Sequence, residues 1–176
     1  MDDIAQELSI SKKTIYQYFK DKEELVSIVA KVHLEKERIE IEQINKTAKN
    51  TMEEFILLSK CIKENHLRMN PVVFWDLKKY YHQAWHIFKE YKNGVFFESL
   101  RSSLKRGIEE GFFREDINID VLAALRMEQI QMTYNEEIFP KDKYDIMEVQ
   151  NQLFNHFVHG VLTQKGEEEF AVNLPL

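Results

Sequence analysis

Seven side chains near the amino terminus form the set with the clearest chemistry in this sequence. They can donate hydrogen bonds to phosphate oxygens, bond the edges of bases or pack against a thymine methyl group. The set consists of Lys12, Lys13, Thr14, Tyr16, Gln17, Tyr18 and Lys22. Residues 11–22 hold four lysines against one aspartate, although the whole chain has a net charge of −6. This local positive charge predicts a small DNA-reading surface, and not a protein that coats nucleic acid with its whole surface.

Two short helices and the start of a third are expected to position these side chains. The first covers residues 2–8 and the second residues 12–19, with Ser11 at the N-cap position. Asp21 has the same role for a long helix over about 22–45, whose first turn carries two glutamates that suit the helix dipole. Two short helices joined by a tight turn form a helix-turn-helix arrangement. An amphipathic hairpin that packs on another protein is the alternative.

This arrangement resembles the signature of a known family. Residues 4–8, IAQEL, and 10–25, ISKKTIYQYFKDKEEL, are similar to the end of the second helix, the recognition helix and the start of the fourth helix in the TetR (tetracycline-repressor) family. The resemblance implies contacts in the major groove from Lys12, Lys13, Thr14 and Gln17. It implies contacts to the DNA backbone from Tyr16, Tyr18 and Lys22. The family has one more helix before this point, so an incomplete head with weakened DNA binding is also expected.

The composition of the whole chain favours an all-α protein. Its 176 residues are 44% hydrophobic and 31% charged, with only five glycines and three prolines, so turns are few and helices long. Further helices are expected over about 51–69, 71–80, 83–110, 120–137 and 144–164, followed by a frayed tail. Thr51 and Glu54 have the spacing of a capping box. The sequence predicts a truncated helix-turn-helix domain with the start of the long helix over 1–45, and a ligand-binding and dimerisation domain over 46–176.

Aromatic side chains are concentrated in residues 72–91. By the resemblance, the helices from the long one onward enclose a ligand cavity, and aromatic and methionine side chains with a few polar groups suit such a cavity. The candidate lining residues are Trp75, Tyr81, Trp85, Phe88, Met127, Gln131 and Tyr134. The expected effector is a small apolar or aromatic molecule. Plain packing in the protein core is the alternative for each of these side chains.

The last two long helices carry apolar stripes that suit a subunit interface. The family pairs these helices with their symmetry mates in a four-helix bundle, so the resemblance implies a homodimer. The candidate interface residues are Leu122, Leu125, Gln129, Met132, Leu153, Phe154, Phe157 and Val161. A monomer that uses the same stripes as its own core is the alternative.

Other kinds of site find little support in the sequence. Cys61 is the single cysteine, so a reducing compartment is expected. The pairs His82–His86 and His156–His159 lack further metal-ligand partners, and no phosphate-binding glycine loop or nucleophile elbow occurs, so we expect neither metal, cofactor nor enzymatic activity. No leader or membrane-spanning run is recognised, which favours a cytoplasmic protein. The sequence thus predicts a ligand-responsive repressor of transcription that binds a pseudo-palindromic double-stranded DNA operator as a dimer. A dimeric ligand-binding or protein-interaction module with a vestigial head is the alternative.

Overall fold

The protein is built from helices in two parts, a small head and a larger body. The computed structural model describes the backbone of residues 1–68 and 72–173, and the side chains of these residues except 66–68, 72, 74, 75 and 173. Its helices are α1 (Asp2–Glu7), α2 (Lys12–Tyr18), α3 (Lys22–Thr47), α4 (Thr51–Arg68), α5 (Val72–Tyr80), α6 (His82–Tyr91), η1 (Lys92–Phe96), α7 (Phe97–Glu109), α8 (Ile119–Met132), α9 (Ile146–Val161) and α10 (Gln164–Asn173). The prediction of an all-α fold is confirmed, since the described residues contain no β-strand.

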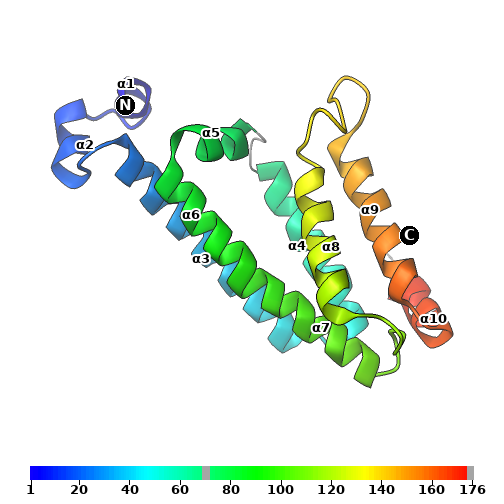
Figure 1. Cartoon of the computed structure of the whole chain (residues 1–176). Coiled ribbons are helices and arrows are strands. Elements are labelled where there is room, and N and C mark those ends of the chain that lie inside the picture. Colours follow the sequence, from blue (N-terminus) through cyan, green and yellow to red (C-terminus); the bar gives the residue numbers. More distant parts are fainter. Residues whose placement is uncertain (69–71, 174–176) are drawn as a thin grey trace.

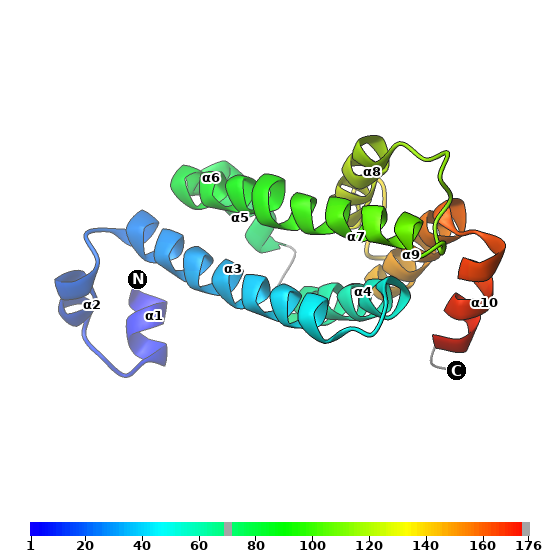
Figure 2. The same ribbon diagram turned by 90° about the horizontal axis from the view of Figure 1, so that it is seen from below.

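The helices are arranged along the length of α3. In Figure 1, α1 and α2 lie at one end, and α3 runs from them behind α6 toward α7. The view in Figure 2 shows α3 alongside the row of α6 and α7, with α8, α9 and α10 gathered at the end far from the head. Side-chain caps define where several helices begin, since Asp21, Asn118 and Asp145 each accept a hydrogen bond from a backbone N–H in the first turn of α3, α8 and α9.

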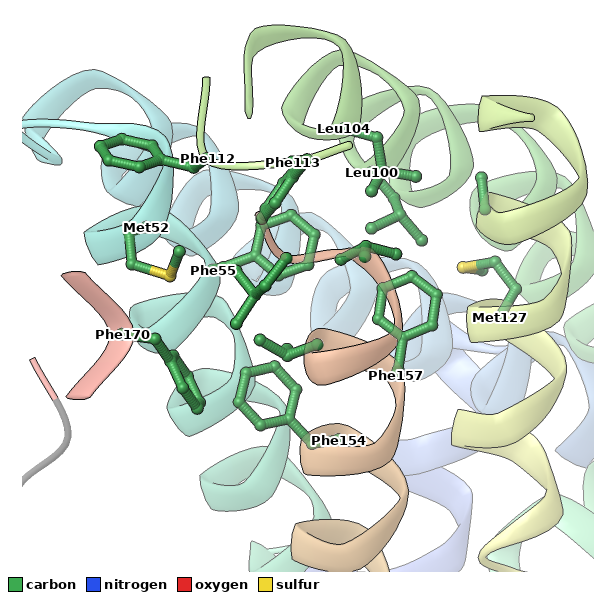
Figure 3. Close-up of a cluster of buried hydrophobic side chains, with 14 residues drawn as sticks. Met52, Phe55, Leu100, Leu104, Phe112, Phe113, Met127, Phe154, Phe157 and Phe170 are labelled. Atoms are coloured by element: carbon green, nitrogen blue, oxygen red, sulfur yellow. The ribbon is translucent and has the colours of Figure 1, made fainter. Parts of the chain in front are cut away.

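The main hydrophobic core lies between α4, α7, α8, α9 and α10 (Figure 3). Phe55 of α4 is at its centre, with its ring edge-on to Phe113 at 5.1 Å and stacked on Phe157 at 6.4 Å. Each fully buried side chain of this size contributes roughly 1.5–3 kcal/mol to folding. The core therefore fixes the far end of the body. Among the described residues, no helix is both long enough and apolar enough to cross a membrane.

Three expectations about the body differ from the structure. The tail predicted to fray forms α10, because Phe170 is buried to 1% exposure and its ring lies 6.3 Å from that of Phe154. The helix predicted over 83–110 is divided by the π-helical segment η1. The helix predicted to reach residue 137 ends at Met132. The predicted restart at Asn70–Pro71 lies outside the described residues.

Candidate functional site

The head is held together locally by Ala5 and Ile15, which are 7% and 4% exposed. Ser11 caps α2, since its Oγ accepts a hydrogen bond from the Thr14 backbone N–H at 3.0 Å. The backbone N–H of Ile10 donates to the Ala5 carbonyl across the turn. The two helices expected from the sequence are thus joined by a tight turn, as a helix-turn-helix requires.

Most of the predicted DNA-contact side chains are available at the surface of the head. The exposed ones are Lys12, Lys13, Tyr16, Gln17, Tyr18 and Lys22. Thr14 is half-buried, and its hydroxyl is 2.8 Å from Ser11 Oγ, so its methyl group is the part left for a contact. Lys12 forms an ion pair with Asp2, which raises the pKa of this lysine. The contacts with DNA remain predictions. Of the four residues expected in the major groove, Lys12 and Thr14 interact with other residues of the head, which leaves Lys13 and Gln17 for DNA.

Ser9, in the turn between α1 and α2, has a left-handed backbone with φ of 52°. Residues with a Cβ pay about 1–2 kcal/mol for this conformation, whereas glycine adopts it freely. We expect Ser9→Gly to stabilise the head by about 0.5–1 kcal/mol, because the gain is partly offset by the greater freedom of glycine in the unfolded chain. Hydrogen exchange of α1 and α2 amides measures this, with Ser9→Ala as the control expected to give no gain. Faster exchange in Ser9→Gly would contradict the prediction.

The long helix α3 joins the head to the body. Lys22, in its first turn, places Nζ 5.5 Å from the ring centroid of Tyr81, just before α6. Glu23 accepts a hydrogen bond from the backbone N–H of Gln83 at 3.2 Å. The position of the head is therefore tied to the start of α6 as well as to α3.

A cavity of about 360 Å³ lies in the body between α3 and the helices that face it. Its wall is mostly apolar. On α3 it is formed by Val26, Val29, Ala30, His33, Leu34, Glu37 and Ile41. These residues follow at intervals of three and four, so they occupy one face of the helix. Lys92 and Phe96 of η1 also line the cavity, in keeping with the frequent use of π-helical turns at functional sites.

The polar groups in this wall are mainly acidic or neutral. Glu37 Oε1 lies 3.3 Å from His33 Nε2, within ion-pair range but not aligned as a hydrogen bond. The Tyr91 hydroxyl is buried without a hydrogen-bond partner, and burial raises its pKa. Burial and the nearby Glu40 carboxylate raise the pKa of the Cys61 thiol to about 12, so this thiol is protonated and unreactive at neutral pH. Lys92 is engaged by Glu128 at 2.8 Å.

Burial raises the pKa of Glu37, the neighbouring Glu40 adds to the effect and His33 opposes it. The ionised carboxylate is thus disfavoured in the fold, and its cost grows as the pH rises above the ordinary carboxyl pKa and through the folded one. We expect Glu37→Gln to raise the free energy of unfolding by about 1 kcal/mol or more at neutral pH, with no gain near pH 4. Urea unfolding across this pH range tests the prediction. The exposed Glu7→Gln is the control, and an equal gain at both pH values would count against it.

The structure separates the predicted ligand-binding residues into two groups. Phe88, Met127, Gln131 and Tyr134 line the cavity. Tyr81 and Trp85 are not part of its wall, since Tyr81 faces Lys22 and Trp85 stacks on Phe88 at 5.4 Å. The Trp75 side chain lies outside the described residues. Sequence reasoning missed the α3 wall, although His33 and Glu37, one turn apart on its apolar face, are a signal that could have shown it.

The sequence of the head is similar to that of a known family. A family model described as bacterial regulatory proteins of the tetR family matches residues 1–28, which include α1, α2 and the start of α3. The head of this chain is thus similar to the DNA-binding region of TetR-family regulators. It is 22% identical over 162 residues to the HTH-type transcriptional regulator YvaF of Bacillus subtilis (strain 168), across 92% of this chain and 84% of that protein.

Solved structures share the fold over both head and body. The ketosteroid transcriptional regulator KstR2 of Mycobacterium tuberculosis has a TM-score of 0.65 and 21% identity, covering 92% of this chain and 84% of that one. FadR of Bacillus subtilis has a TM-score of 0.67 and 20% identity, covering 90% and 87%. A regulator from Cytophaga hutchinsonii has a TM-score of 0.71 and 18% identity, covering 93% and 88%. The relatives that these comparisons name are transcription regulators.

The residues of the predicted subunit interface fall into two groups by burial. Four of them are buried within this chain, with exposures between 1% and 7%, namely Gln129, Phe154, Phe157 and Val161. Phe154, Phe157 and Val161 belong to the hydrophobic core of the body. Leu122, Met132 and Leu153 are half-buried and Leu125 is 47% exposed. Val121, 60% exposed one turn before Leu125, extends this remaining face.

Proposed function

We propose that this chain is a ligand-responsive repressor that binds a pseudo-palindromic operator as a homodimer. The observation that carries the proposal is the continuity of α3. Lys22 stands at its first position, beside the head, and the cavity wall from Val26 to Ile41 occupies the same helix. A group that enters the cavity therefore touches the element that positions the DNA-contact residues.

The mechanism follows from the geometry of B-DNA. Two heads must sit about 34–36 Å apart to enter successive major grooves on one face of the duplex. A helix of 26 residues is about 39 Å long, so a tilt of about 5° around its far end moves the head by about 3 Å. A ligand that binds the tilted form more tightly shifts the population away from the DNA-binding form.

The relatives suggest the character of the effector. KstR2 is named a ketosteroid regulator, and the FadR structure is a complex with stearoyl-CoA. Both names point to large apolar molecules, and the apolar wall and volume of the cavity in this chain suit the same character. We therefore propose a mainly apolar small molecule as the effector, and the exposed apolar face with Val121 and Leu125 as part of the dimer contact.

Fluorescence anisotropy with labelled duplexes tests the function. The duplexes are tiled across the DNA upstream of the protein's own gene and then across genome-derived fragments. The expected result is tight binding to at least one duplex with a steep loss of affinity as salt is raised, since phosphate contacts dominate such binding. Binding at the non-specific level to every fragment would overturn the regulator proposal and favour a dimeric ligand-binding module.

A further inference from the structure

A buried cation, Arg126, and a half-buried one, Lys63, lie against the same aromatic ring of α9. Arg126 of α8 is 7% exposed, and its guanidinium lies over the rings of Phe154 and Phe157 at 5.4 and 5.7 Å. Lys63 of α4 places its Nζ 5.6 Å from the same Phe154 ring. Among the residues described, neither cation has an acidic group within ion-pair distance. A buried charge without a counter-charge is costly, so this arrangement calls for an anion.

The polar groups around these cations also lack partners. Gln150 of α9 is 6% exposed, and both its amide oxygen and its amide nitrogen are buried without a hydrogen bond. Burial lowers the pKa of Arg126 to about 10, and burial followed by repulsion from Arg126 lowers the pKa of Lys63. Arg126 remains charged at neutral pH and repels a positive charge on Lys63. A negatively charged group between them would relieve the repulsion and give Gln150 a partner.

The space beside Arg126 suits a small anion. An inner hollow of about 10 Å³ is lined by Lys63, Arg126 and Gln150, and this is about the space that one water-sized group needs. A middle hollow of about 30 Å³ is also lined by Arg126. These volumes fit the oxygens of a carboxylate and not a bulky nucleotide-like head.

The two hollows lead toward the 360 Å³ cavity. Ile62 and Ile130 line all three spaces, so the side chains of these two residues form the walls between them. The wall of the large cavity also contains Glu37 and the Tyr91 hydroxyl, which has no hydrogen-bond partner among the described residues. The inner hollow is lined instead by the two cations Lys63 and Arg126. An anionic head is therefore attracted to the hollow beside Arg126.

We infer that the effector is an apolar molecule with a free carboxylate, which pairs with Arg126 and Lys63 while its apolar chain passes Ile62 and Ile130 into the cavity. This inference rests on the proposed effector-binding function and adds the charge and the orientation of the effector. Gln150 donates its amide N–H to the same carboxylate. A neutral alcohol or a thioester lacks the charge that the two cations require.

Dodecanoate and dodecanol are the probes, with the S-methyl thioester of dodecanoic acid as the uncharged thioester, and calorimetric titration of the full chain measures their affinity. Dodecanoate is expected to bind about tenfold or more tightly than dodecanol, because hydrogen bonds between charged groups exceed neutral ones by that margin. Arg126→Met keeps an unbranched side chain and removes its charge, so it should abolish this preference. Lys63→Met should reduce it. Lys60→Met, exposed on the same helix, should leave it unchanged.

The fold of the variants is checked by thermal unfolding. Arg126→Met should unfold at the same temperature as the wild type or higher, since an unpaired buried charge has been replaced by an apolar side chain. The inference is overturned if dodecanol or the thioester binds the wild type as tightly as dodecanoate, or if Arg126→Met keeps the preference. If neither probe binds while operator binding persists, the carboxylate-binding site is disproved and the proposed regulator function is retained. Absence of operator binding is instead a failure of the proposed function.

Discussion

The double variant Lys13→Ala/Gln17→Ala is expected to lose specific operator binding while its fold is unchanged. Both side chains are exposed on α2, and neither forms a hydrogen bond or ion pair within the described head, so their removal leaves Ala5 and Ile15 packed as before. Lysine pairs with guanine and glutamine with adenine in the major groove, at about 1–3 kcal/mol for each good contact. A dimer loses each contact twice, so even at the low end of this range we expect an affinity lower by about 1000-fold.

Anisotropy with the operator and with an unrelated duplex of equal length measures this effect. Specific affinity should fall far more than non-specific affinity, because base contacts carry the sequence information and phosphate contacts do not. Lys31→Ala is the matched control, since Lys31 is exposed on α3 away from the head. An equal loss for both duplexes would show that Lys13 and Gln17 contact only phosphates. A comparable loss in Lys31→Ala would assign the effect to overall charge.

The head could be predicted from sequence because its structure is local. Ser11 caps α2 through Thr14, and Asp21 caps α3 through Glu24, each within three residues. The exposed side chains of α2 then follow from helical periodicity alone. The turn at Ser9 is also a local feature, because a small residue stands where the chain must reverse between α1 and α2.

The cavity and the interface could not be predicted in the same way. An apolar stripe on a helix shows that a face is covered, but not whether the cover is a core, a ligand or a second subunit. Phe154 and Phe157 were assigned to the interface, yet the core between α4 and α7 covers them. Trp85 was assigned to the cavity, yet it packs outside its wall on Phe88. These outcomes depend on contacts between helices far apart in the sequence.

Glu54 has the sequence spacing of a capping residue but a different structural role. The sequence predicted a capping box of Thr51 and Glu54, but the cap is made one residue earlier. Asn50 Oδ1 accepts a hydrogen bond from the Glu53 backbone N–H at 2.9 Å, and Glu53 accepts one from the Lys49 backbone N–H at 2.6 Å. The Glu54 carboxylate points inward instead, with 1% exposure. It forms an ion pair with Arg106 and accepts a hydrogen bond from Ser103, both on α7.

Replacing this carboxylate is expected to have a large effect on stability. Glu54→Ala leaves Arg106 and Ser103 without their buried partner, and removal of one member of a buried pair costs about 3–5 kcal/mol. Arg106 is 40% exposed, so water screens part of its charge and we expect the lower end, about 3 kcal/mol. Urea unfolding of the two proteins measures the difference. Because α4 and α7 also carry Ser59 and Leu100 beside the middle hollow, the same variant should weaken effector binding.

The neighbouring residue provides the control for this prediction. Glu53 has the same side chain and lies in the same turn of α4, but its ion pair with Lys49, at 3.9 Å, is at the surface. Glu53→Ala should therefore cost less than about 1 kcal/mol beyond the loss of its cap bond. The double variant Glu54→Met/Arg106→Met should recover much of the stability lost in Glu54→Ala, because no unpaired charge remains. If Glu54→Ala costs no more than Glu53→Ala, the pair with Arg106 does not hold α4 against α7, and packing of Phe55 and its neighbours must account for that contact.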